Sequence, residues 1–123
     1  MKFHDAKVVS IDLGPAENRT AVIGLVDAAG KSYELLLDNL ERMRCFDFRE
    51  GNIVLELTTT TGSTPPLNVM EKLFDLAPET AQPTYLTDRI KKIETGHLTL
   101  LHIAPSYGCE IIALCDKVRV LNR

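Results

Sequence analysis

The 123-residue sequence lacks the features that mark membrane and secreted proteins. No stretch contains the roughly 18 consecutive apolar residues that a membrane-spanning helix needs. The opening segment, residues 1–13, has no apolar run long enough for a signal peptide. We therefore expect a soluble, cytoplasmic protein with no membrane partner.

Cysteine is scarce, and its spacing predicts neither a metal site nor a redox motif. The three cysteines are Cys45, Cys109 and Cys115, an odd number. Along a straight strand Cys109 and Cys115 would lie about 20 Å apart, too far for a disulfide. We expect free, buried thiols in a reducing cytosol and no cofactor.

The sequence also lacks a strong excess of one charge. It has 14 Lys and Arg residues against 17 Asp and Glu residues, which gives a net charge of −3. Such a balance implies no general affinity for nucleic acid or for anionic membranes. The acidic excess lies in residues 1–66, which carry ten acids and seven bases.

No set of residues with catalytic spacing is present. Among the histidines, His97 and His102 are five residues apart, so in a strand they face opposite sides and cannot share a metal ion. Residues 105–108, Pro-Ser-Tyr-Gly, lack the leading glycine of a nucleophile elbow, and residues 58–64 lack the second glycine and the lysine of a phosphate loop. We expect a non-enzymatic protein without catalytic, cofactor-binding or metal-binding residues.

The apolar residues that are present indicate a sheet that contains a deeply buried hairpin. Two long apolar stretches, Leu98–Ala104 and Ile111–Val120, flank the turn signal at residues 105–108. Upstream, residues 6–13, 19–27, 32–40 and 53–59 have strand patterns, with Ile53, Leu55 and Leu57 facing inward in the last. Residues 41–46 fit either a continued strand or a short helical turn. The spacing of strands and turns favours an antiparallel meander.

Between the two strand-rich regions the apolar period becomes helical. In the first predicted helix Asn68 is the N-cap and Glu71 completes a capping box; the helix ends before Pro78. The second covers residues 84–95 and ends at Gly96. The order predicts an α+β fold: residues 1–123 as a single domain, a mostly antiparallel sheet of about six strands, and two helices packed on one face.

Two stretches of the first 57 residues resemble a known family. One is residues 3–6, Phe-His-Asp-Ala, followed directly by a strand. The other is residues 37–40, Leu-Asp-Asn-Leu, running into residues 46–48, Phe-Asp-Phe, and residues 52–54. Together they resemble small bacterial immunity proteins of polymorphic and contact-dependent toxin systems. The resemblance implies a compact cytoplasmic protein that binds and blocks one cognate toxin; it carries over no binding residues, because the family shares none.

Exposed acids are the candidate partner-binding residues, because opposed charge speeds encounter with a basic partner such as a nuclease toxin. The candidates are Asp38, Glu41, Asp47, Glu50, Glu56, Asp75 and Glu79. Three arginines, Arg42, Arg44 and Arg49, are expected to form salt bridges with Glu41, Asp47 and Glu50. The expected partner is a protein toxin and not nucleic acid, and the chain itself is either a monomer or a homodimer.

Two other functions remain open at this stage. The chain would serve as a scaffold if it self-associates through an exposed sheet edge or its helical face. It would bind a small ligand if a pocket between the sheet and the helices contains Tyr85, His102 or Tyr107.

Overall fold

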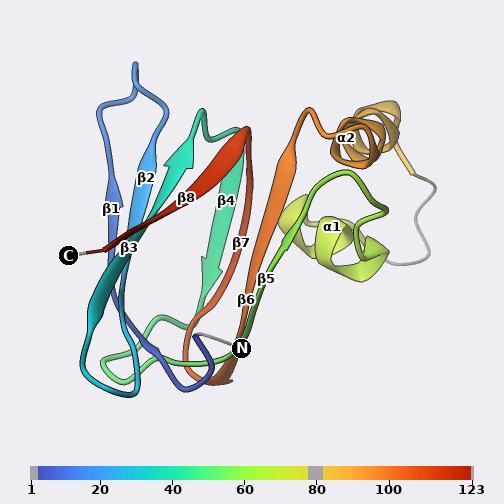
Figure 1. The fold of residues 1–123 in the computed structure, drawn as a ribbon. Coiled ribbons are helices and arrows are strands. Elements are labelled where there is room, and N and C mark those ends of the chain that lie inside the picture. The colour runs from blue at the N-terminus through green and yellow to red at the C-terminus, as the bar shows by residue number, and fades with distance from the viewer. Residues whose placement is uncertain (1–2, 78–81, 123) are drawn as a thin grey trace.

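The computed structural model describes residues 3–77 and 82–122, which form two helices and eight strands (Figure 1). In chain order the elements are β1 (Lys7–Leu13), β2 (Ala21–Val26), β3 (Ser32–Asp38), β4 (Arg42–Phe46), β5 (Ile53–Thr60), α1 (Leu67–Leu73), α2 (Thr84–Glu94), β6 (Thr99–Tyr107), β7 (Glu110–Cys115) and β8 (Lys117–Asn122). The predicted α+β class with two helices is confirmed. The predicted number of about six strands is wrong.

All eight strands belong to one antiparallel sheet with the order β4-β7-β6-β5-β1-β2-β3-β8. The link between β5 and β1 is narrow, with Lys7 opposite Ile53 as its one register pair. The sheet folds over at this link, so that one core cluster contains residues from both halves, such as Ile23 and Leu35 from one and Leu101 and Ile111 from the other. The β2 strand lies between β1 and β3 and is therefore an interior strand of the sheet.

The two additional strands arise where the chain crosses from one half of the sheet to the other. Between β3 and β4 the backbone turns at Asn39, which has a positive φ of 50°. Between β7 and β8 it turns at Asp116, whose N–H donates to the carbonyl of Asp38 over 3.0 Å. Asn39 Nδ2 also donates to Asp116 Oδ2 over 3.0 Å. The two crossings therefore stabilise each other, and they separate β4 and β8 from the strands that precede them.

Irregularities in β5 and β1 change which side chains face the core. The register of β5 against β6 shifts on both sides of Val54. As a result Val54 is fully buried and Leu55 is half-exposed, so the predicted inward face Ile53/Leu55/Leu57 is wrong at its centre. A similar shift in β1 buries Val8 and exposes Val9.

Both helices pack on the outer face of the β6–β7 hairpin (Figure 1). A second core cluster joins Met70 of α1 and Ile93 of α2 to Leu100 of β6 and Ile112 of β7. The hairpin is therefore buried on both faces, which explains its unbroken apolar runs and confirms its predicted place deep in the sheet. Its turn is tighter than predicted, because β6 extends to Tyr107.

The helix ends differ in how well the sequence predicted them. Pro66 is the N-cap of α1 and Asn68 lies inside the helix, so the predicted capping box is wrong. The end of α2 is confirmed: Gly96 has a φ of 84°, and its N–H donates to the carbonyl of Ile93. The predicted stop at Pro78 lies outside the described residues. In the described parts of the chain we find no helix with the length and apolar character needed to span a membrane.

Candidate protein-binding surface

The predicted partner-binding acids lie on different elements of the fold. Asp38 is on β3, Glu41 precedes β4, and Asp75 follows α1. Asp47, Glu50 and Glu56 all belong to one segment, residues 47–56, which comprises the turn after β4 and the start of β5. Glu79 lies outside the described residues. Three of the seven candidates therefore share one segment of the chain, and the other described candidates lie on separate elements.

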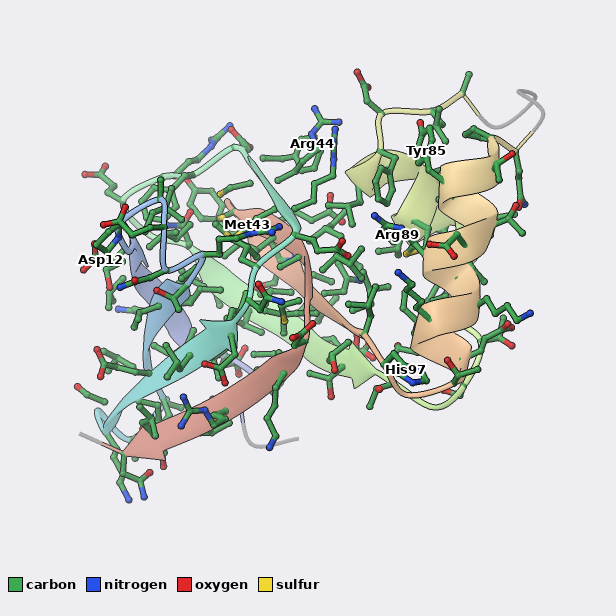
Figure 2. The ribbon with its side chains drawn as sticks, turned by 90° about the horizontal axis from the view of Figure 1, so that it is seen from above. Asp12, Met43, Arg44, Tyr85, Arg89 and His97 are labelled. Atoms are coloured by element: carbon green, nitrogen blue, oxygen red, sulfur yellow. The ribbon has the colours of Figure 1, made fainter. Side chains whose placement is uncertain are left out.

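Four of these carboxylates already pair with arginines of the same chain. The pairs are Asp38–Arg119 at 2.8 Å, Glu41–Arg89 at 3.2 Å, Asp47–Arg49 at 3.0 Å and Asp75–Arg44 at 3.4 Å. The Arg119 guanidinium donates to Asp38 and holds the pKa of this carboxyl below its ordinary value. Figure 2 shows Arg89 on the side of α2 that faces the sheet, where it reaches Glu41. By contrast, Glu50 and Glu56 form no ion pair with any residue that the structure describes.

The expected pairing of the three arginines with nearby acids is correct only for Arg49. Arg42 donates from Nε to the carbonyl of Leu73 over 2.8 Å, and Arg44 donates from Nη1 to the carbonyl of Lys72 over 3.0 Å. These carbonyls belong to the last turn of α1, where backbone acceptors lack partners within the helix. The two arginines of β4 therefore hold α1 against the sheet.

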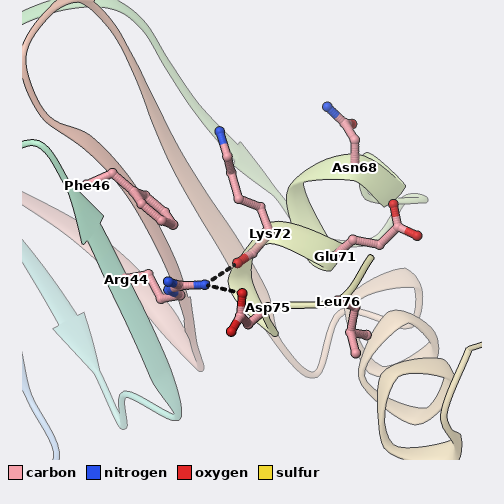
Figure 3. A pocket seen from close by; sticks show the side chains of 7 residues that line it. All are labelled: Arg44, Phe46, Asn68, Glu71, Lys72, Asp75 and Leu76. Atoms are coloured by element: carbon pink, nitrogen blue, oxygen red, sulfur yellow. Dashed lines mark hydrogen bonds and ion pairs between the residues drawn. The ribbon is translucent and has the colours of Figure 1, made fainter. Parts of the chain in front are cut away.

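A surface hollow of about 330 Å³ lies beside this contact between β4 and α1 (Figure 3). Its lining residues are Arg44, Phe46, Asn68, Glu71, Lys72, Asp75 and Leu76. Arg44 and Lys72 carry positive charge, Glu71 and Asp75 carry negative charge, and Arg44 already contacts Asp75. The hollow therefore has no charge preference for a ligand.

An ion cluster on the outer face of the hairpin also anchors α1. Glu110 of β7 accepts from Lys72 Nζ at 2.6 Å and lies 2.9 Å from His102 Nε2. Burial raises the pKa of Glu110, but the contacts with Lys72 and His102 outweigh it, so the pKa falls below its ordinary value. The arrangement is a structural bridge between α1 and the hairpin, with both acid oxygens occupied.

The three residues of the predicted ligand pocket are not brought together. His102 contacts Glu110, while the Tyr85 ring lies 5.4 Å from that of Phe74, and the Tyr107 ring lies 5.6 Å from the Arg49 guanidinium. Among the described residues, no group of three or more His, Cys, Asp or Glu side chains is placed to hold a metal ion.

Two half-exposed aromatic side chains lie at one end of the sheet, where the turn after β4 meets the β6–β7 turn. The exposed fractions are 49% for both Phe48 and Tyr107. Asp47 and Glu50 flank Phe48 in sequence, and Arg49 connects the turn to Tyr107. We call Asp47, Phe48, Glu50 and Tyr107 the turn surface. Sequence reasoning selected its acids but not Phe48 as an anchor, because nothing in the chain shows that this ring stays outside the core.

A buried asparagine fixes the turn surface. Asn52 is 1% exposed, and its Oδ1 accepts from the backbone N–H of Arg49 at 2.7 Å and of Cys109 at 3.0 Å. Its Nδ2 donates to the carbonyl of Arg49 and, over 3.4 Å, to that of Val8. This one side chain therefore ties the turn after β4 to β1 and to the start of β7. These four hydrogen bonds hold the turn in place.

Beside Phe48 lies a small apolar pocket of about 400 Å³ between β1 and β4, lined by Val9, Ser10, Ile11, Cys45 and Phe48.

All three cysteines are free. Cys109 and Cys115 are buried, but Cys45 is exposed, so the prediction of buried thiols is wrong for Cys45. The difference follows from the place of Cys45 on the edge strand β4. Burial raises the pKa of Cys115 to about 12.

Comparison of the chain with protein-family models, with curated proteins and with solved structures finds no match.

Proposed function

We propose that this protein is a non-enzymatic inhibitor that binds a basic bacterial protein toxin through the turn surface, as an immunity protein does. The observation that supports the proposal is that a turn held by Asn52 carries Asp47, Glu50 and the half-exposed ring of Phe48, and that the half-exposed ring of Tyr107 lies against Arg49 of the same turn. Aromatic side chains are among the residues that contribute most to protein–protein affinity. Acids around them favour encounter with a positively charged partner.

The rest of the geometry fits this mode of binding. Because Asn52 holds the turn in place, binding needs little rearrangement, as in other preorganised complexes. Within the turn surface, Glu50 forms no ion pair with the described residues and so keeps its charge for a partner. A nuclease toxin with a basic substrate groove would match this surface, and the bound protein would block the groove.

The proposal is tested by capture followed by inhibition. The tagged protein is used to retain its partner from the source bacterium, and the retained chain is identified by mass spectrometry. We expect the C-terminal domain of a large secreted protein. Expressed alone, this domain should stop bacterial growth, and co-expression of the present protein should restore it.

A matched pair of variants separates the turn surface from other exposed aromatic positions. The double variant Phe48→Ala/Tyr107→Ala should fail to restore growth. Tyr85→Ala, which removes a ring that is 47% exposed on α2, should restore growth like the wild type. A stoichiometric complex in which the toxin stays fully active would overturn the proposed inhibition, and equal rescue by the double variant would overturn the proposed surface.

One observation favours self-association as a second function. The β8 strand is at the end of the strand order, and within the described residues no strand pairs with its outer edge. Val120 and Leu121 on this strand are both exposed. Unpaired edges of this kind are templates for pairing with another chain. If two copies pair through β8, sedimentation velocity should show a concentration-dependent dimer that Leu121→Lys abolishes; a monomer at all concentrations would refute it.

A further inference from the structure

Two cysteines that are far apart in the sequence meet at the edge of the sheet. Cys45 is on β4, and Cys109 lies directly before β7. The register places Phe46 opposite Glu110 and Cys45 opposite Ile111, so Cys109 is the diagonal neighbour of Cys45. Their sulfur atoms are 2.7 Å apart, only about 0.7 Å more than the length of a disulfide bond.

The two thiols differ in how a reagent can reach them. Cys45 is exposed and lines the apolar pocket with Val9, Ile11 and Phe48. Cys109 is 1% exposed and lies behind it. A small molecule therefore reaches the sulfur of Cys45 first, with the sulfur of Cys109 already in position to attack that same atom.

We propose that Cys45 and Cys109 form a reversible oxidation site, which takes a small-molecule disulfide such as oxidised glutathione as its oxidant. The Cys45 thiolate attacks one sulfur of glutathione disulfide, breaks its S–S bond and releases one glutathione, which takes up the proton that Cys45 lost. The Cys109 thiol then gives its proton to solvent and attacks Cys45 Sγ, which breaks the mixed disulfide bond and releases the second glutathione as a thiolate that takes up a proton from solvent. In total two protein thiols are oxidised to one disulfide, and one glutathione disulfide is reduced to two thiols.

The second step is expected to be the slower one. Burial raises the pKa of Cys109, and the neighbouring Cys45 raises it further, so little of its reactive thiolate is present at neutral pH. The mixed disulfide on Cys45 should therefore accumulate before the internal disulfide forms.

The bond would lock the edge strand β4 to β7. The two positions are 64 residues apart, and the enclosed loop contains β5, both helices and β6. Because β4 also carries the arginines that bind the end of α1, oxidation would restrain the helical side of the molecule. This site does not depend on the proposed toxin binding.

The test uses the full-length protein, incubated under native conditions with oxidised glutathione and analysed by alkylation and mass spectrometry. The reduced protein has three free thiols, and the oxidised protein should have one, at Cys115, with the peptides of Cys45 and Cys109 joined. Dithiothreitol should restore all three. Cys115→Ser is the matched control and should oxidise like the wild type.

Two further variants identify the order of the steps. Cys45→Ser, a change at an exposed position, should neither form the mixed disulfide nor lose its thiol at Cys109. Cys109→Ala should stop at the mixed disulfide on Cys45. The proposal is overturned if the folded wild type keeps three thiols, if it stops at the mixed disulfide, or if Cys45→Ser is oxidised at the rate of the wild type.

Discussion

Replacing Asn52 with alanine should lower the free energy of unfolding by about 3 kcal/mol. The change leaves the N–H of Cys109 without its acceptor in a buried position, which costs about 2 kcal/mol. It also removes the acceptor of the Arg49 N–H, which is nearer to solvent, at a cost of about 1 kcal/mol. Because a domain of this size is stable by only roughly 5–15 kcal/mol, the loss is a large fraction of the total.

Urea denaturation followed by circular dichroism measures this loss. With a slope of about 1–3 kcal/mol per molar urea, the midpoint should fall by roughly 1–3 M while the slope stays constant. Asn68→Ala is the matched control, since it changes an exposed asparagine of α1 and should alter stability by no more than about 0.5 kcal/mol. A loss below about 1 kcal/mol for Asn52→Ala would refute the conclusion that this side chain organises the turn.

Three further predictions concern the contacts around the turn and α1. Gly108→Ala should destabilise the protein by roughly 2–4 kcal/mol in thermal unfolding, since its φ is 82° and an added Cβ would collide with neighbouring atoms; Gly30→Ala, with a similar φ and open space, should cost only about 1 kcal/mol. The lowered pKa of Glu110 stabilises the fold above the unfolded value of about 4.3, and this stability is lost as the pH falls through the folded pKa. Urea unfolding between pH 6 and pH 3 should therefore show a smaller acid-induced loss for Lys72→Met than for the wild type, and an equal loss would contradict the assignment. Arg44→Ala should cost about 1 kcal/mol and speed hydrogen exchange in α1, whereas unchanged exchange there would show that this arginine does not hold the helix.

The central part of the fold follows from local patterns in the sequence. The apolar runs of β6 and β7 contain enough Leu and Ile on both faces to require burial on both sides, and the structure supplies the core cluster on one side and the helices on the other. Likewise, the helical period and Gly96 define α2 and its end, because both signals act within a few residues.

The additional strands could not be found in this way. The breaks at Asn39 and Asp116 stabilise each other across the fold, over a separation of 77 residues, and neither contains the glycine or proline that usually marks a turn. The bulge in β5 also reverses an inward face through tertiary pairing with β6. The local hydrophobic periodicity of the sequence therefore predicts neither the two crossings nor the bulge.

Contacts between residues far apart in the sequence also limit what the sequence shows about the candidate site. Asp38 and Glu41 look like free surface acids in the sequence, but their partners, Arg119 and Arg89, come from distant elements. The contact between Cys45 and Cys109 likewise depends on the pairing of β4 with β7. Asp47 and Glu50 are predicted as exposed acids, but the half-exposed rings of Phe48 and Tyr107 near them become apparent only in the structure.

The most direct test of the proposed function is the dissociation constant of the captured toxin domain, measured by calorimetry for wild-type protein and for two variants. We predict that Phe48→Ala/Tyr107→Ala weakens binding by at least about 100-fold, since each anchor contributes about 2 kcal/mol or more. Tyr85→Ala should leave the constant within about twofold of wild type. If the double variant binds as tightly as Tyr85→Ala, the turn surface is not the toxin-binding site.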